Sequence, residues 1–94
     1  MIKTALFPLG RIVVTPGAVS ALEESAHRPD EFLSRHVSGD WGELCQEDRE
    51  ANEFSVLHGY RMILSAYTTR NGQKLWVITE YDRSVTTLLL PDEY

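Results

Sequence analysis

Hydrophobic positions along the chain change their spacing twice, from a β-like pattern to a helical one and back. Residues 11–14 form a run rich in branched apolar residues after Gly10, which predicts a short strand. From residue 15 to residue 58 apolar side chains recur every three or four positions, as in helices that pack through one face. After Gly59 the pattern alternates, as in strands. This order predicts an α+β domain with a short N-terminal strand, about three helices and a three-stranded antiparallel β-meander packed on the helices.

Capping residues set the bounds of the three predicted helices. Thr15 suits the N-cap of the first helix because Pro16 follows it at the first helical position. The second helix begins at Pro29 and stops before Gly39, a residue suited to the left-handed position after a helix. The third covers about residues 46–57. We expect three of its side chains to face the core, namely Ala51, Phe54 and Leu57.

The pair Asn71-Gly72 is the strongest hairpin signal in the chain, since it suits a two-residue type I′ turn with positive φ at both positions. A two-residue loop pairs Arg70 with Gln73 and therefore places Tyr67 opposite Trp76. Both faces of the hairpin are then apolar. One face carries Leu64, Ala66, Leu75 and Val77. The other carries Ile63, Tyr67, Trp76 and Ile78, with Glu80 opposite Ile63.

The helices of so small a domain can cover one face of this hairpin but not both. The face that carries Ile63, Tyr67, Trp76 and Ile78 is therefore a candidate surface for a protein partner or for a homodimer. The alternative is that the N-terminal strand and the C-terminal tail fold over it.

Charge excludes one class of partner. The 94 residues suit a single small domain, residues 1–94, and their formal net charge is −5. Acidic residues gather against a single base, Arg49, and are Asp40, Glu43, Glu47, Asp48, Glu50 and Glu53. Nucleic-acid binders need positive surface to displace counterions from phosphates, so we expect no direct binding of DNA or RNA. The acidic segment is a solvated helix face, a surface for a basic partner, or an imitation of a phosphate row.

Cysteine and the N-terminus indicate a cytoplasmic location. Cys45 is the only cysteine, so no intramolecular disulfide can form, which suits a reducing compartment. The apolar run near the N-terminus is interrupted by Pro8 and Gly10, so it is neither a secretion signal nor a membrane span. We expect no membrane partner.

The string HVSGDWGEL, residues 36–44, gathers polar and aromatic residues that carry chemistry: His36, Asp40, Trp41 and Glu43. The imidazole and carboxylates could form an acid–base group or part of a metal site, with further ligands from His27, Cys45 or His58. No spacing such as CxxC or HExxH is present, so we expect no metal and no cofactor. No known nucleophile motif surrounds Cys45, which weakens covalent catalysis with His36 or His58.

The same string also has an architectural interpretation. His36 in the last turn of a helix favours the negative helix end when charged. Gly39 reverses the chain, and Asp40 bonds backbone amides in the turn. Trp41 fills the junction, and Gly42 allows a second bend before the third helix.

A second polar cluster lies in the turn between the last two strands. It contains Glu80, Asp82 and Arg83, with hydroxyl residues on either side. An arginine among carboxylates and hydroxyls could bind an anion or a partner's backbone. Alternatively, it forms an internal arginine–carboxylate pair that locks the meander to the helices.

Several strings resemble a known set of proteins: RHVSGDWGEL, EDREAN, LSAYTT, KLWVITEYDRSVTTLLLP and the terminal DEY. They are similar to small bacterial proteins encoded on plasmids and integrated mobile elements, some of which carry restriction-system labels. The resemblance extends over nearly the whole chain, and it implies a bacterial cytoplasmic accessory protein of mobile DNA. The positions that match its most specific strings are His36, Asp40, Trp41, Asp82 and Arg83.

Together these patterns predict a non-enzymatic protein-interaction module that modulates a host defence or DNA-processing protein. One alternative is a small enzyme or ligand-binding protein that uses the His36–Asp40–Glu43 corner with Asp82 and Arg83. Another is a homodimer with no further activity, built through Tyr67, Trp76 and Ile78.

Overall fold

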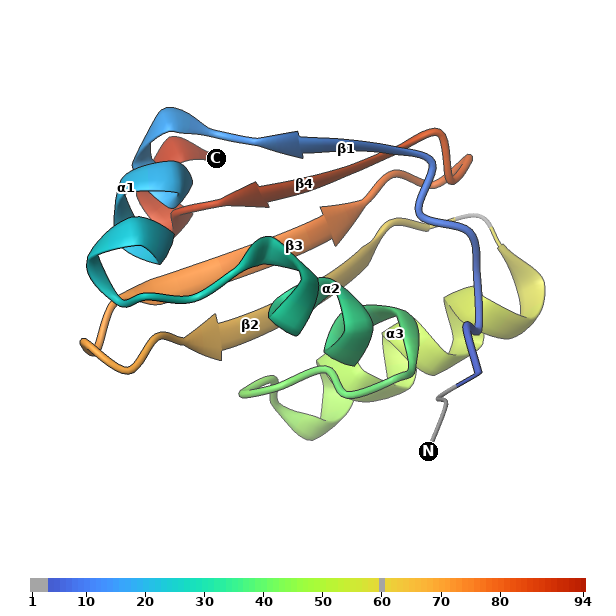
Figure 1. Cartoon of the computed structure of the whole chain (residues 1–94). Coiled ribbons are helices and arrows are strands. Elements are labelled where there is room, and N and C mark those ends of the chain that lie inside the picture. Colours follow the sequence, from blue (N-terminus) through green and yellow to red (C-terminus); the bar gives the residue numbers. More distant parts are fainter. Residues whose placement is uncertain (1–3, 60) are drawn as a thin grey trace.

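The computed structural model describes residues 4–59 and 61–94, and it has the predicted α+β order. Its strands are β1 (Arg11–Val14), β2 (Ile63–Thr68), β3 (Lys74–Thr79) and β4 (Val85–Leu89). Its helices are α1 (Pro16–Glu24), α2 (Pro29–Val37), α3 (Gln46–His58) and the short 3-10 helix η1 (Pro91–Glu93). The four strands form one sheet in the order β1-β4-β3-β2 (Figure 1). β2, β3 and β4 make the antiparallel meander, and β1 is parallel to β4.

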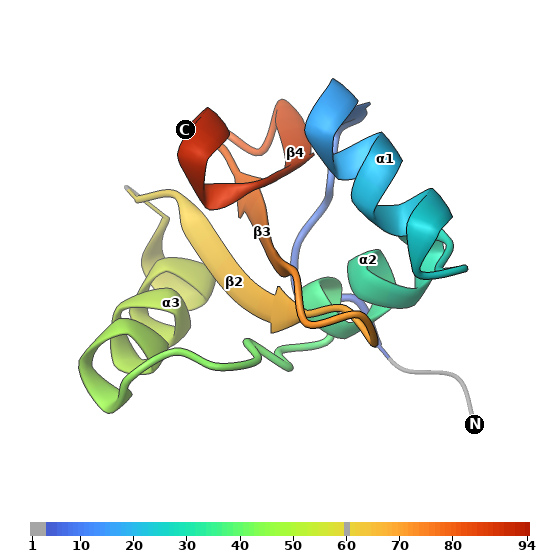
Figure 2. The same cartoon turned by 90° about the vertical axis from the view of Figure 1, so that its left-hand side faces the viewer.

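Helices cover one face of the sheet and one of its edges. Figure 2 shows α1 and α2 on one side of the sheet, with α3 beside β2. The main core lies under α1 and α2 and contains Ala18, Leu22, Phe32, Tyr67, Leu75, Val77 and Leu88. A smaller cluster of Phe7, Trp41 and Ile63 lies nearer α3. In the part of the chain that the structure describes, no helix has the length and apolar character needed to cross a bilayer.

The predicted helix boundaries are confirmed. Thr15 caps α1, because its Oγ1 accepts a hydrogen bond from the backbone N–H of Ala18 at 3.2 Å, and Pro16 follows it. α2 ends at Val37, and Gly39 lies beyond it with a φ of 90°. Gly59 ends α3 with a φ of 76°.

The predicted register of the β2–β3 hairpin is wrong by one residue. Ala66 pairs with Trp76, and Tyr67 pairs with Leu75. Of the two turn residues, Gly72 alone has a positive φ, 84°, because the loop contains three residues, 70–72, rather than two. Thr69 N–H donates to the Gln73 carbonyl at 2.9 Å and closes that loop. A three-residue loop needs only one left-handed residue, which is why the Asn-Gly pair was misleading.

The register shift separates the four residues of the predicted interface. Ile63 and Tyr67 are fully buried on the face under the helices. Trp76 and Ile78 lie on the opposite face, since one residue of shift reverses every side chain of a strand. These four side chains therefore share no surface. β1 extends the sheet instead of folding over it, whereas the Tyr94 ring does contact Trp76, 5.9 Å between centroids.

The predicted core face of α3 is also wrong. Phe54 and Leu57 are 54% and 78% exposed, and only Ala51 is partly buried. The helix instead buries Asn52 and Ser55 against β2. The reason is that α3 lies along the edge of β2, where backbone groups require polar partners.

Candidate functional site

His36 is a buried member of a hydrogen-bonded chain rather than an exposed catalytic group. The last turn of α2 directs its ring into the sheet, where it has no exposed surface. Nδ1 lies 2.6 Å from Ser65 Oγ, and Nε2 lies 2.9 Å from Thr79 Oγ1. The rings of Phe7 and Trp41 meet it edge-on, at centroid distances of 5.3 and 6.0 Å.

Counting protons gives the direction of every bond in this chain. Thr86 donates its single hydroxyl proton to the Leu9 carbonyl at 2.7 Å, so it must accept from Thr79, 2.7 Å away. Because the Thr79 hydroxyl donates its only proton to Thr86, it accepts from Nε2–H of His36. Nδ1 is therefore the acceptor, and Ser65 donates to it. A neutral imidazole with its proton on Nε2 fits this site.

Burial lowers the pKa of His36 from 6.5 to about 3. A base with so low a pKa does not take up a proton near neutral pH, and this one is not open to a substrate. His36 thus joins α2, three strands and the N-terminal segment, which contradicts its predicted place as a charged residue at a helix end.

Asp40 and Trp41 build the turn that follows α2, as the architectural interpretation predicts. Asp40 accepts from Arg35 Nε at 2.7 Å and from the Gly42 N–H at 3.3 Å. Its carbonyl accepts from the Tyr67 hydroxyl at 2.6 Å. Trp41 is buried, and its carbonyl accepts from the N–H of a β2 residue.

Glu43 lies at a different place on the surface, at the end of the hairpin. Its carboxylate accepts from Thr68 Oγ1 at 2.8 Å and from Lys74 Nζ at 3.1 Å. The Thr68 bond, and then the Lys74 bond, lower the pKa of Glu43. Glu43 is therefore paired with the sheet and not with His36.

Arg83 locks the β3–β4 turn to α3, but through carbonyls and not through a carboxylate. Its guanidinium donates to the carbonyls of Ser55 and Arg61, each at 2.8 Å. The Ser55 carbonyl also accepts from the Gly59 N–H at 2.8 Å, so Arg83 adds a second donor where α3 ends. Asp82 instead accepts from the Ser84 N–H and hydroxyl inside the turn. None of the ion pairs among the described residues contains Arg83, so the predicted arginine–carboxylate pair is wrong.

The Phe7 ring contacts both polar clusters, since its centroid lies 5.3 Å from that of the His36 ring and 5.9 Å from the Arg83 guanidinium carbon. His36 itself is fully buried and offers no surface to a substrate. Cys45 precedes α3 and His58 ends it, so a 13-residue helix of about 20 Å separates these two. Within residues 4–59 and 61–94, no three His, Cys, Asp or Glu residues are placed to hold a metal ion.

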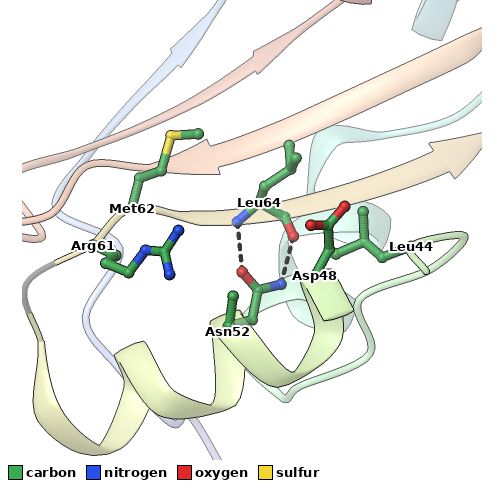
Figure 3. Close-up of a pocket in the computed structure, with 7 residues that line it drawn as sticks. Leu44, Asp48, Asn52, Arg61, Met62 and Leu64 are labelled. Atoms are coloured by element: carbon green, nitrogen blue, oxygen red, sulfur yellow. Dashed lines mark hydrogen bonds between the residues drawn. The ribbon is translucent and has the colours of Figure 1, made fainter. Parts of the chain in front are cut away.

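The outer edge of β2 is bonded by residues that sequence reasoning missed. The Asn52 amide imitates a neighbouring strand: Nδ2 donates to the Leu64 carbonyl at 2.6 Å, and Oδ1 accepts from the Leu64 N–H at 3.1 Å (Figure 3). Two residues further along, Ala66 bonds the Trp41 carbonyl and the Glu43 N–H. The available signal was polar Asn52 and Ser55 spaced one turn apart within a helix.

A small pocket lies between α3 and β2 beside this edge. Asp48 and Arg61 flank it, and Met62 and Leu64 form part of its wall (Figure 3). Its volume is about 110 Å³, whereas pockets for metabolites hold roughly 300–1,000 Å³. It has room for a side chain of a partner rather than for a substrate.

The outward side of α3 is both acidic and apolar. We define the acidic face of α3 as five exposed residues, Glu47, Glu50, Glu53, Phe54 and Leu57. Phe54 and Leu57 are one turn apart, and the Phe54 ring also contacts His58, 4.5 Å between centroids. Among the described residues, none of the three carboxylates has an ion-pair partner. Two large, exposed apolar side chains thus lie beside carboxylates that form no ion pair with a described residue, although Glu50 accepts a hydrogen bond from Gln46 at 3.2 Å.

Comparison with known proteins adds no further constraint. No protein-family model, curated protein or solved structure matches the chain.

Proposed function

We propose that the protein is a non-enzymatic interaction module that binds another protein through the acidic face of α3. The observation that carries this proposal is the exposure of Phe54 and Leu57, 54% and 78%, on a helix whose buried side is polar. Water disfavours such a pair, and a partner groove that accepts both side chains removes that cost.

Charge specifies the partner. Glu47, Glu50 and Glu53 precede the apolar pair along the exposed side of α3, so the complementary groove has an apolar floor and Lys or Arg along one side of its rim. Proteins that process or restrict DNA carry such basic surfaces, because they bind phosphates. The proposed partner is therefore a basic host defence or DNA-processing protein, and the module is a cytoplasmic accessory protein of mobile DNA.

The arrangement of the polar residues weighs against the small enzyme. His36, Asp40, Glu43 and Arg83 each bond to structural partners, and His36 has no exposed surface. A binding function needs no free acid or base, and it uses the surface that the fold leaves exposed.

Affinity capture from a bacterial lysate tests the proposal with matched variants. The wild type and a Tyr81→Ser control are expected to retain a basic protein that Phe54→Ser/Leu57→Ser loses. Tyr81 is a fair control, since its side chain is 65% exposed and lies outside α3. Capture should also weaken steeply as salt rises. Equal capture by all three proteins, or a bound protein that salt does not release, would contradict the proposal.

A further inference from the structure

The two edges of the sheet differ in whether their backbone N–H and C=O groups have hydrogen-bond partners. Backbone groups along the outer edge of β2 form hydrogen bonds with Asn52, Trp41 and Glu43. β1 forms the other edge, and Figure 1 shows no element on its outer side. An unprotected edge strand is a template for another strand.

The register of β1 shows which groups are open. Arg11 N–H donates to the Ser84 carbonyl at 2.9 Å, and Thr15 N–H donates to the Leu88 carbonyl at 3.0 Å. In a parallel ladder with these bonds, the N–H and C=O groups of Ile12 and Val14 point away from β4. None of the described residues bonds to them.

We propose that two copies of this chain pair through their β1 edges in antiparallel fashion, about a two-fold axis at Val13, to form one eight-stranded sheet. In this register Ile12 of each copy pairs with Val14 of the other, which gives four N–H···O=C bonds. A register centred on Ile12 needs Gly10, whose φ of 65° is not extended, and one centred on Val14 needs Pro16, which has no N–H. Val13 is thus the centre that uses strand residues alone.

Shape complementarity favours a second copy as the occupant. Opposite residues of an antiparallel pair project to the same face, so Ile12 of the second copy lies next to Val14. Val14 lines a pocket of about 200 Å³, together with Val19 and Leu22 of α1. Ile12 is 41% exposed, and in the dimer it enters the pocket of the other copy. The same chain supplies both the projecting side chain and the pocket.

Charge complementarity favours the same arrangement. The register places Arg11 opposite Thr15 of the second copy. Thr15 Oγ1 donates to the Glu93 carboxylate at 2.6 Å, and Gly17 N–H holds the other oxygen at 3.0 Å. The guanidinium of Arg11 has no partner among the residues that the structure describes. The dimer interface therefore brings Arg11 of each copy toward Glu93 of the other, which makes two such contacts by symmetry.

Light scattering and sedimentation of the full chain test the dimer. The wild type is expected at twice the monomer mass of 10.7 kDa, and Ile12→Asp should weaken the dimer at least about tenfold. Met62→Asp is the matched control, because Met62 is 40% exposed near the protected edge, and it should leave the mass unchanged. A wild type that is monomeric at about 100 µM, or a dimer insensitive to Ile12→Asp, overturns the proposal.

Cross-linking decides the case if Ile12→Asp fails to fold. In a Cys45→Ser background, Val13→Cys places two thiols across the axis at a non-hydrogen-bonded pair, where Cα atoms are about 4.5 Å apart and a disulfide can form. Oxidised glutathione should join these copies, but not Arg11→Cys copies, whose thiols lie four residues apart along the pair. Equal cross-linking of both variants, or of neither, overturns the proposal. Phe54→Ser/Leu57→Ser should not change the mass, so failure of the dimer and failure of the α3 proposal are distinguishable.

Discussion

His36 Nε2 donates to Thr79 Oγ1 at 2.9 Å, and this bond joins the last turn of α2 to the centre of the sheet. The chain of hydroxyls continues through Thr86 to the Leu9 carbonyl, and Ser65 bonds the other ring nitrogen, so one neutral imidazole on α2 connects three strands and the N-terminal segment. A residue that resembles a catalytic base in the sequence is thus part of the core.

Loss of this imidazole should destabilise the fold. His36→Ala removes buried volume and leaves Ser65 and Thr79 without their partner, so we expect a loss of about 2–4 kcal/mol. Urea denaturation measures it, and His58→Ala is the control, since His58 is exposed and its loss should cost about 0.5 kcal/mol or less. Equal effects of the two substitutions would contradict the structural role.

The low pKa of His36 predicts the pH dependence of stability. Below pH 6.5 His36 is protonated in the unfolded chain, whereas in the folded chain it stays neutral down to about pH 3. The free energy of unfolding must therefore fall as the pH drops through this window. The steepest slope is about 1.4 kcal/mol per pH unit. Between about pH 6 and pH 5 this slope should be present in the wild type and absent in His36→Gln. The carboxylates with lowered pKa, including Glu43 and Glu93, add their loss only below their ordinary values near 4.5. An equal slope in both proteins would show that folding does not lower the pKa of His36.

Asn52→Ala should expose the β2 edge. The substitution removes both hydrogen bonds to Leu64, and we expect a loss of about 1–3 kcal/mol together with faster aggregation from a newly open strand. Glu53→Ala, the next residue on the outer side of α3, is the matched control and should do neither. Unfolding free energy and light scattering on incubation provide the two readouts. If Asn52→Ala stayed as soluble and stable as the control, edge protection would have to lie elsewhere.

Alanine substitutions of Gly42 and Gly59 distinguish the cost of lost close packing from the cost of backbone strain. Both have a φ of 76°, so alanine is strained at either position. A Cβ on Gly42 also meets the Ala66 carbonyl oxygen, whereas a Cβ on Gly59 meets nothing within 4 Å. Gly42→Ala should therefore cost at least about 2 kcal/mol more than Gly59→Ala in thermal or urea denaturation. Similar costs would mean that the segment 41–43 does not lie against β2.

Local signals in the sequence were sufficient for the order of elements and most helix ends. Thr15 with Pro16, and Gly39 after α2, act on neighbouring backbone groups, so their effect is readable without knowing the fold. The hairpin signal was also local, but its loop length depends on which residues adopt a positive φ. Asn71-Gly72 suits both a two-residue and a three-residue loop. The incorrect two-residue loop shifts the register by one residue and so assigns side chains of one strand to the wrong face of the sheet.

The core face of α3 and the role of His36 depended on distant partners. Periodicity assigns Phe54 and Leu57 to a core because it assumes that buried means apolar. Asn52 is buried because it bonds to β2, the strand at that edge of the sheet. No residue near Asn52 in the sequence indicates that it lies beside an edge strand. His36 likewise requires Ser65 and Thr79, which are 29 and 43 residues away.

The most direct test of the account is the affinity of the captured basic protein for the purified wild type and two variants. Phe54→Ser/Leu57→Ser should raise the Kd at least about tenfold and change the unfolding free energy by about 1 kcal/mol or less, because both side chains are largely exposed. Tyr81→Ser should leave the Kd unchanged, and higher salt should weaken the wild-type complex. A Kd that is equal for all three proteins would show that the acidic face of α3 is not the binding surface.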